Sequence, residues 1–460
     1  MKLNYKRTVL VGFAFFLICT FWQAYDTVIP KILTDKFGMS QSFSGVIMAL
    51  DNVIAVILLP VFGAISDRHN GKRGRRTPFV LVGTVLAVIA FVGLSFVDNV
   101  QLAAIEKGVS EIGIEATEAR LAYAWEMTCN NPVILIFFIL MLLVVLLSMA
   151  VFRSPAVALM PDVTPKPLRS KGNAVINLMG AVGGILVLAL GIVFGTGKPE
   201  NTIMSYTPFF AVVAAVMLAA LVIFALTVKE PKWAAEADVI NNKLDAAADT
   251  PNEVIEKHSL AKGELKSLLF ILASVVLWYM GYNAVSSKYS VYAGEVLKLD
   301  YNLTLMVAQA AAIVSYIPGG IISQKFGRRK TILAGVAMLG TAFGCAYFMG
   351  EGSNIWIMNA LFALAGIGWA TINVNSYPMV VELASSGDTG KYTGYYYTAS
   401  MAAQTVTPIL SGFFMDINLK TLFPYATVFV ALAFVTMLFV RHGDIKTDSK
   451  KDLLEHLDLE

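Results

Sequence analysis

The sequence contains twelve long apolar segments that follow one another along almost the whole chain. Each is about as long as an α-helix must be to cross a lipid bilayer, which is about 20 residues. Only 15% of the 460 residues are charged, whereas a soluble domain carries about 25%. The sequence therefore predicts an all-α membrane protein with twelve transmembrane helices. The apolar segments are 8–30, 43–66, 77–97, 132–160, 171–197, 206–228, 265–292, 302–323, 331–349, 355–380, 392–416 and 423–440.

Lysine and arginine are concentrated in alternate connections between these segments. The densest cluster lies in residues 63–79, which read GAISDRHNGKRGRRTPF. Because cytoplasmic loops carry an excess of Lys and Arg, the pattern predicts that both termini are cytoplasmic. The chain is accordingly predicted to be a multi-pass protein of the plasma (cytoplasmic or inner) membrane, embedded in the lipid bilayer. A net charge of +3 is too small to indicate a nucleic-acid partner.

A polar stretch halfway along the chain divides the apolar segments into two sets of six. We predict an N-terminal six-helix bundle at 1–228, a cytoplasmic linker loop at 229–264, a C-terminal six-helix bundle at 265–441 and a cytoplasmic tail at 442–460. A second long polar stretch, 98–131, is expected on the outer side. The spacing of its glutamates predicts one short surface helix, either as a solvated face or as a lid over a pathway.

The two sets of segments also resemble each other in sequence. The segment GGIISQKFGRRKT at 319–331 is a weaker copy of the basic cluster, at an offset of 257 residues. Such a duplication predicts two pseudo-symmetric six-helix bundles, an architecture found in many membrane transporters. The same offset places Phe21, Trp22, Tyr25 and Asp26 on Trp278, Tyr279, Tyr282 and Asn283.

Three ionisable side chains lie well inside the apolar segments of the first half: Asp26, Asp51 and Arg153. Charges at such depth are costly and are usually functional. We therefore predict Asp26 or Asp51 as the proton-coupling carboxylate, with Arg153 as its partner. All four histidines lie in loops or tails, so a carboxylate would have to carry a coupled proton. The alternative is a static buried ion pair that holds helices together.

Aromatic and amide side chains share helix faces with these charges. Trp22, Tyr25 and Asp26 lie on one face of the first segment, at spacings of three and four residues. Such groups suit a sugar, although tryptophan and tyrosine also collect in belts at the membrane interface. The predicted substrate-binding residues are Trp22, Tyr25, Asp26, Arg153, Tyr279, Tyr282, Asn283, Asn373, Tyr397 and Gln404.

The basic cluster resembles the signature loop of a known family. The pattern Gly-x-x-x-Asp-Arg followed by Gly-Arg-Arg, between the second and third segments, resembles that of the major facilitator superfamily. Residues 60–79, PVFGAISDRHNGKRGRRTPF, are similar to the corresponding loop of sucrose–proton symporters and of glycoside–pentoside–hexuronide cation symporters. Residues 153–174, RSPAVALMPDVTPKPLRSKGNA, give a second match. The resemblance implies the major facilitator fold and transport by alternating access.

The chain departs from the glycoside symporters at their cation site. Where that family holds sodium or a proton with two aspartates, this chain has Ala55 and Leu59 and keeps only the further Asp51. Arg153 stands where that family has a sugar-binding Asp, and a carboxylate of the sucrose symporters falls on Leu146. The comparison favours proton over sodium coupling and leaves uncoupled transport open.

Acidic residues stand near the bases at the predicted cytoplasmic end. Carboxylate–arginine pairs there would form when the cytoplasmic side shuts and break when it opens, and the resemblance implies this role for Asp67 and the Gly-Arg-Arg cluster. The alternative is that these charges only set the topology. The predicted cytoplasmic gate consists of Asp67, Arg68, Arg75, Arg76, Asp162, Arg328, Arg329 and Glu382.

Together these features predict a secondary active transporter that imports a glycoside or small oligosaccharide with a proton. The alternatives are an anionic sugar or organic acid as substrate, export of a sugar or drug, and a non-transporting sensor. The sequence shows no nucleotide-binding loop, metal-ligand cluster or catalytic triad, so neither an enzyme nor a metal or other cofactor is expected. The expected state is a monomer.

Overall fold

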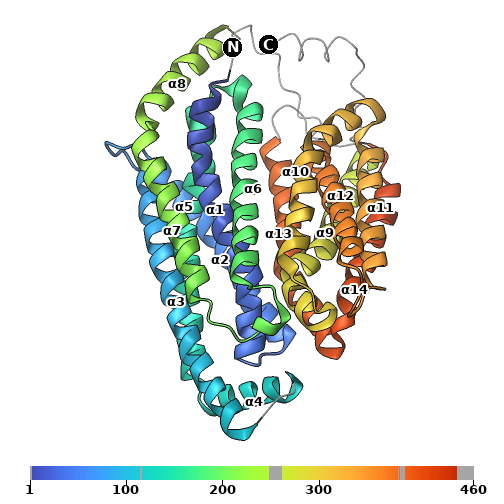
Figure 1. Ribbon diagram of the computed structural model, residues 1–460. Helices are drawn as coiled ribbons and strands as arrows, with labels where there is room; N and C mark the ends of the chain where they lie inside the picture. Colours follow the sequence, from blue (N-terminus) through green and yellow to red (C-terminus); the bar gives the residue numbers. More distant parts are fainter. Residues whose placement is uncertain (1–2, 114–116, 248–261, 382, 384–388, 443–460) are drawn as a thin grey trace.

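The computed structural model describes residues 3–113, 117–247, 262–381, 383 and 389–442. Over these residues the protein contains fourteen α-helices and no β-strand (Figure 1). Helices suit a bilayer because every backbone hydrogen bond is made within the segment itself. The helices of the first half are α1 (Tyr5–Lys31), α2 (Gln41–Arg68), α3 (Thr77–Ile112), α4 (Thr117–Asn130), α5 (Val133–Val163), α6 (Arg169–Phe194), α7 (Thr207–Thr227) and α8 (Glu230–Ala247). Those of the second half are α9 (Lys262–Tyr292), α10 (Tyr301–Phe326), α11 (Arg328–Ala346), α12 (Ile355–Val381), α13 (Thr389–Ile417) and α14 (Leu422–Leu438).

Two separate clusters of buried hydrophobic side chains hold these helices together. The first is built from residues between Val11 and Trp233, and the second from residues between Leu268 and Val440. Each cluster therefore belongs to one half of the chain. The halves meet where α2 lies against α13, α6 against α10, and α1 against α9 (Figure 1).

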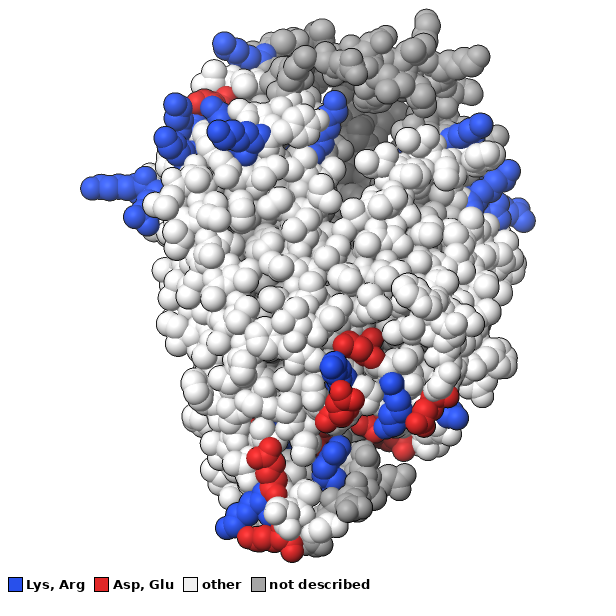
Figure 2. All heavy atoms as spheres, in the orientation of Figure 1, with Lys and Arg blue, Asp and Glu red and all other residues white. Residues whose placement is uncertain are grey.

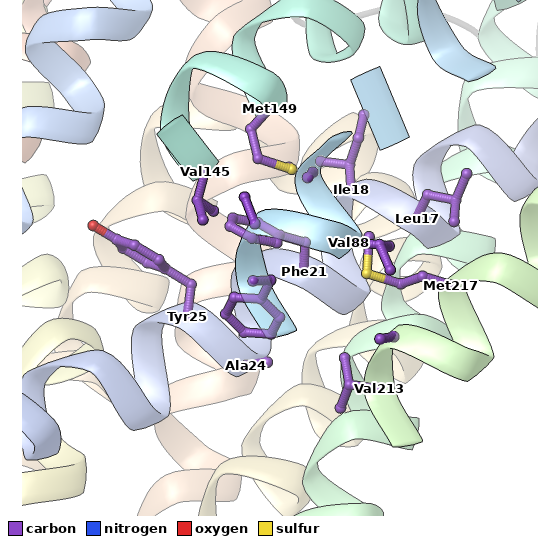
Figure 3. Close-up of a cluster of buried hydrophobic side chains, with 14 of the residues drawn as sticks. Leu17, Ile18, Phe21, Ala24, Tyr25, Val88, Val145, Met149, Val213 and Met217 are labelled. Carbon is purple, nitrogen blue, oxygen red and sulfur yellow. The ribbon is translucent and has the colours of Figure 1, made fainter. Parts of the chain in front are cut away.

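Helix α1 presents different faces to the two halves. Figure 3 shows Phe21 within the first cluster, close to Val88 of α3, Val145 of α5 and Val213 of α7. Tyr25, one turn further along α1, is also buried, but its ring extends away from these apolar side chains. Tyr25 nevertheless belongs to the first cluster and stacks on Phe21 with ring centres 5.9 Å apart.

Ten of the described helices are long and apolar enough to cross a membrane: α1, α2, α3, α5, α6, α7, α9, α10, α12 and α14. Helices α11 and α13, which correspond to the predicted segments 331–349 and 392–416, are not among these ten. On the face shown in Figure 2, a broad middle band carries no charged side chains. We call the end of the molecule with residues 63–79 the basic end, and the end with α4 the opposite end (Figures 1 and 2).

Helix α3 is longer than predicted. The apolar segment was expected to end at residue 97, but α3 continues to Ile112, and the outer stretch forms this extension and α4 instead of one short helix. Asp98, where the apolar pattern stops, is fully buried in an ion pair with Lys36 at 2.5 Å. The ammonium group of Lys36 also lies 4.6 Å from the ring of Tyr206. A buried charge pair thus interrupts the hydropathy pattern but not the helix.

The stretch predicted as a linker loop begins with helix α8. Trp233 and Ala237, one turn apart on α8, are buried against the first half. The guanidinium of Arg7 lies 5.4 Å from the centre of the Trp233 ring and pairs with Glu236. These contacts fasten α8 to α1 although its composition is polar.

Candidate functional site

The three ionisable residues predicted inside the membrane come together in the first half. The guanidinium of Arg153 on α5 lies 5.2 Å from the centre of the Trp22 ring on α1. Arg153 also interacts electrostatically with Asp51 of α2 and Asp26 of α1. Trp22 and Asp26 reach the same site because they lie one turn apart on α1. All four side chains are partly buried.

A small pocket opens at this charged cluster. Trp22, Asp51 and Arg153 line it together with apolar residues of α2 and α5. Ala55, Leu59 and Leu146, the positions at which the sequence resemblance places carboxylates in related symporters, also line this pocket. These three positions are therefore apolar here, and the charges at this site are those of Asp26, Asp51 and Arg153. The other lining residues are Ile54, Met149 and Ala150.

The second half contributes an aromatic cluster. The rings of Tyr282 on α9 and Trp369 on α12 are parallel to within 1° with their centres 3.6 Å apart. Tyr279 packs edge-on against Trp369 at 5.1 Å, and its hydroxyl donates to the side-chain oxygen of Asn373 at 3.4 Å. The amide of Asn373 donates in turn to the backbone carbonyl of Trp369 at 3.1 Å. Three of the predicted binding residues, Tyr279, Tyr282 and Asn373, thus lie together, and their role in binding stays a prediction.

Two contacts join the two halves near the charged and aromatic clusters. Asp26 interacts electrostatically with Tyr282. The amide nitrogen of Gln309 on α10 donates to the side-chain oxygen of Gln23 on α1 at 3.4 Å. Four buried polar atoms in this region have no hydrogen-bond partner within the described protein: Trp22 Nε1, Tyr25 Oη, Asn283 Nδ2 and Gln309 Oε1. Buried polar groups are almost always satisfied, so these four atoms are free to bond to a group other than the described protein.

Two predicted binding residues on α13 lie in a different setting. The Tyr397 ring packs against Tyr377 and Tyr396 and is 54% exposed. The amide of Gln404 donates to the carbonyl of Ser400 in its own helix at 3.3 Å. Neither contact connects these residues to the charged cluster, so their role remains a prediction.

At the basic end, three helices of the first half meet through charge. Arg76, the residue before α3, pairs with Asp67 at the end of α2 and with Asp162 at the end of α5, the latter at 2.8 Å. Arg75 pairs with the same Asp162 at 2.8 Å. Burial would lower the pKa of Arg76, but the hydrogen bonds and charges of Asp162 and Asp67 outweigh it, and the pKa of Arg76 is raised. The guanidinium is therefore held in its charged form.

The remaining predicted gate residues are placed as follows. Arg68 is the exposed last residue of α2. Arg328 and Arg329 begin α11, and Arg329 donates to the carbonyl of Leu438 at 2.7 Å, within the second half. Glu382 lies outside the described residues.

Several charged or aromatic residues of these sites were missed in the sequence. Trp369 lies in an apolar segment and was not among the predicted binding residues. Glu230, at the start of α8, accepts hydrogen bonds from the backbone amides of Arg75 and Arg76, each at 2.8 Å. Lys31 and Lys288 are buried at the opposite end. The sequence did contain a sign of the two lysines: the repeat offset of 257 residues aligns Lys31 with Lys288.

The sequence family follows from a direct comparison. The family model of the Major Facilitator Superfamily matches residues 11–316 and 300–456. The chain therefore belongs to this superfamily, and the resemblance inferred from the basic cluster is confirmed. It is accordingly a transporter-type membrane protein and not an enzyme.

Individual proteins and solved structures match this chain at low sequence identity. The sucrose transport protein SUC3 of Arabidopsis thaliana is 28% identical over 162 residues, which cover 35% of this chain and 25% of that protein. The uncharacterized symporter YjmB of Bacillus subtilis is 20% identical over 426 residues, covering 89% of this chain and 83% of its own. Among solved structures, the inward open xylose transporter XylE of E. coli superposes with a TM-score of 0.64 at 14% identity, covering 98% of this chain and 100% of that one. Such low identity shows the shared fold alone.

Proposed function

We propose that the protein is a secondary active transporter with twelve transmembrane helices in two six-helix bundles and with both termini in the cytoplasm. At about 1.5 Å per residue, α11 is about 28 Å long and α13 about 44 Å, against a bilayer core of about 30 Å. The two hydrophobic clusters, each confined to one half, support two bundles. The basic residues of 63–79 support a cytoplasmic basic end in the plasma membrane.

In this proposal the cargo is a glycoside or small oligosaccharide, imported together with a proton. The main observation in support is that Asp26 and Asp51 both interact electrostatically with Arg153 at a partly buried site beside Trp22. Two carboxylates facing one guanidinium can take up one proton to become neutral as a group. Arrival or departure of a substrate that touches this group would then change its affinity for the proton.

The same charge balance favours a neutral substrate over an anionic one. With both carboxylates ionised, Asp26, Asp51 and Arg153 carry a net negative charge, which repels an anion. The stacked rings of Tyr282 and Trp369 supply a flat apolar surface of the kind that a sugar ring covers. The names of SUC3, a sucrose transport protein, and of YjmB, a symporter, support a coupled sugar carrier at this coarse level.

Alternating access is supported by the contrast between the two ends. At the basic end, the pairs of Arg75 and Arg76 with Asp67 and Asp162 are formed but lie within the first half, so they do not hold the two halves together and need not break when this end opens. At the opposite end, hydrogen bonds cross between the halves, as between the carboxylate of Asp416 on α13 and the backbone N–H of Gln41 on α2. This arrangement corresponds to a carrier closed at its outer end.

The experiment is reconstitution of the purified protein into liposomes that contain a pH dye. We expect neutral glycosides to acidify the lumen, and Asp51→Asn to abolish uphill uptake while preserving exchange of labelled substrate. Asp238→Asn, at an exposed position of α8, is the matched control and should leave uptake unchanged.

Other outcomes of this experiment contradict parts of the proposal. Acidification only with uronides or other organic anions would assign the substrate charge to Arg153. Tracer flux without acidification would mean uncoupled transport and a structural role for the carboxylates. Binding without any flux would indicate a sensor.

A further inference from the structure

Two buried lysines occupy equivalent positions in the two halves, at the opposite end of the molecule. The repeat offset of 257 residues places Lys31 of α1 on Lys288 of α9. Their exposed fractions are 2% and 0%. Lysine is almost never fully buried unless it is paired, so two such residues at matching positions call for a physical reason.

Each lysine lies where its own half meets the other half. The ammonium group of Lys288 donates to the backbone carbonyl of Gln41, the first residue of α2, at 2.7 Å. Lys31 donates to the backbone carbonyl of Thr196 at 3.1 Å and lies 5.7 Å from the ring of Tyr301, the first residue of α10. The hydroxyl of Tyr301 bonds to the Thr196 side chain at 3.1 Å, so this contact also joins the two halves.

Other groups supply the attraction that closes this end. The carboxylate of Asp416 on α13 accepts the backbone N–H of Gln41 at 2.5 Å and that of Ser42 at 2.9 Å. A negative charge at the start of a helix is favourable because the helix dipole is positive there. A Cβ atom on Gly45 of α2 would overlap the carbonyl oxygen of Pro408, so α2 and α13 meet backbone to backbone.

The two lysines, in contrast, are poorly compensated for their burial. Within the described residues, neither ammonium group has a carboxylate oxygen within 4.0 Å, and the carboxylates that attract Lys31, those of Asp35, Glu295 and Asp300, act from beyond that distance. Each ammonium has three N–H donors, and the acceptors found are two oxygens of Gln41 for Lys288 and one carbonyl for Lys31. Asp416, which interacts electrostatically with Lys288, is exposed to water, which weakens their attraction. Removing a charge from water costs free energy that such partners do not fully return.

We infer that Lys31 and Lys288 are release elements of an outer gate, which we define as Gln41, Ser42, Thr196, Tyr301, Asp416 and the two lysines. Closing the gate buries both ammonium groups, and opening it hydrates them again. The lysines therefore oppose the closed state that Asp416 and the glycine contact favour, and they return the carrier to its outward-open form. This inference rests on the proposed orientation but not on the proposed substrate or coupling.

The test is labelling of a buried cysteine from outside the cell. Ser44→Cys, on α2 beside Gly45, introduces a thiol at a position that is 0% exposed in the closed gate. Cys19, Cys129 and Cys345 are replaced by serine, and a membrane-impermeant maleimide is applied to intact cells. Lys288→Met and Lys31→Met should each slow the labelling by about tenfold, because an apolar side chain removes the cost of burial. Asp416→Ala should accelerate labelling by about tenfold, because it removes charge-assisted hydrogen bonds that close the gate.

Lys420→Met, at an exposed lysine near the same end, is the control and should not change the rate. Faster or unchanged labelling in folded Lys288→Met and Lys31→Met protein would overturn the inference. Failure of both variants to fold would also overturn it, because the lysines would then support the closed structure. The assay needs no substrate, so a wrong assignment of the cargo would leave its result intact.

Discussion

The carboxylate of Glu230 accepts both the backbone N–H of Thr77, at 2.7 Å, and the hydroxyl of the same residue, at 2.6 Å. The first residue of α8 thus caps the first turn of α3, across 153 residues of sequence. The capping oxygen comes from a distant helix and not from the usual preceding residue. The helix that was expected to be a loop therefore stabilises the basic end of the first half.

We expect Glu230→Ala to lower the free energy of unfolding by about 3 kcal/mol, because backbone amides at the start of α3 lose a charged, buried acceptor. The midpoint of thermal unfolding in detergent, followed by size-exclusion chromatography, measures this loss. Glu106→Ala, at an exposed site on α3, is the matched control. Equal midpoints for the two variants would show that Glu230 does not cap α3.

Two acidic residues of the predicted cytoplasmic gate, Asp67 and Asp162, should differ in importance. Asp162 pairs with both Arg75 and Arg76 and its side chain is 15% exposed, whereas Asp67 pairs with Arg76 and is 57% exposed. Exposed pairs contribute about 0–1 kcal/mol. We expect Asp162→Asn to reduce the uptake rate about tenfold and Asp67→Asn to reduce it less than about threefold. Initial uptake rates at matched protein levels decide this, and a larger effect of Asp67→Asn would contradict the assignment.

Trp369 should determine substrate affinity more than transport rate. Its ring lies flat on Tyr282, so Trp369→Phe retains an aromatic surface and Trp369→Ala removes it. We expect Trp369→Ala to raise KM for uptake about tenfold, and Trp369→Phe to raise it about threefold or less. Trp356→Ala, at an exposed position near the start of α12, controls for the loss of a tryptophan. A change in kcat with constant KM would argue against a binding role.

The ion pair between Lys36 and Asp98 should be costly to break but replaceable. Both side chains are 0% exposed. Lys36→Met alone leaves a buried, uncompensated carboxylate and should destabilise the protein by about 3–5 kcal/mol. The double variant Lys36→Met, Asp98→Leu should recover most of this loss, because an apolar pair needs no compensation. Thermal unfolding of Lys36→Met, of Asp98→Leu and of the double variant forms a double-mutant cycle. If the loss of stability in the double variant equals the sum of the losses in the two single variants, the two residues are not coupled.

The sequence by itself determined the class of the protein. Hydropathy revealed the apolar segments, because each one must span the bilayer on its own. The segments correspond to twelve helices of the structure, and ten of these helices are long and apolar enough to cross a membrane. The basic cluster at 63–79 carried the family resemblance. Asp26, Asp51 and Arg153 stood out because a charge in an apolar segment is visible without knowledge of its neighbours.

Only the tertiary structure decided which of these residues meet. The pairing of Lys36 with Asp98, the cap of Glu230 on Thr77 and the stacking of Tyr282 on Trp369 each join segments far apart in the chain. Hydropathy averages over one segment at a time, so it reads a buried charge as the end of a helix and cannot show which ring a tryptophan stacks on. The cost of burying a polar group depends on partners that other helices supply, and these are fixed only when the helices pack.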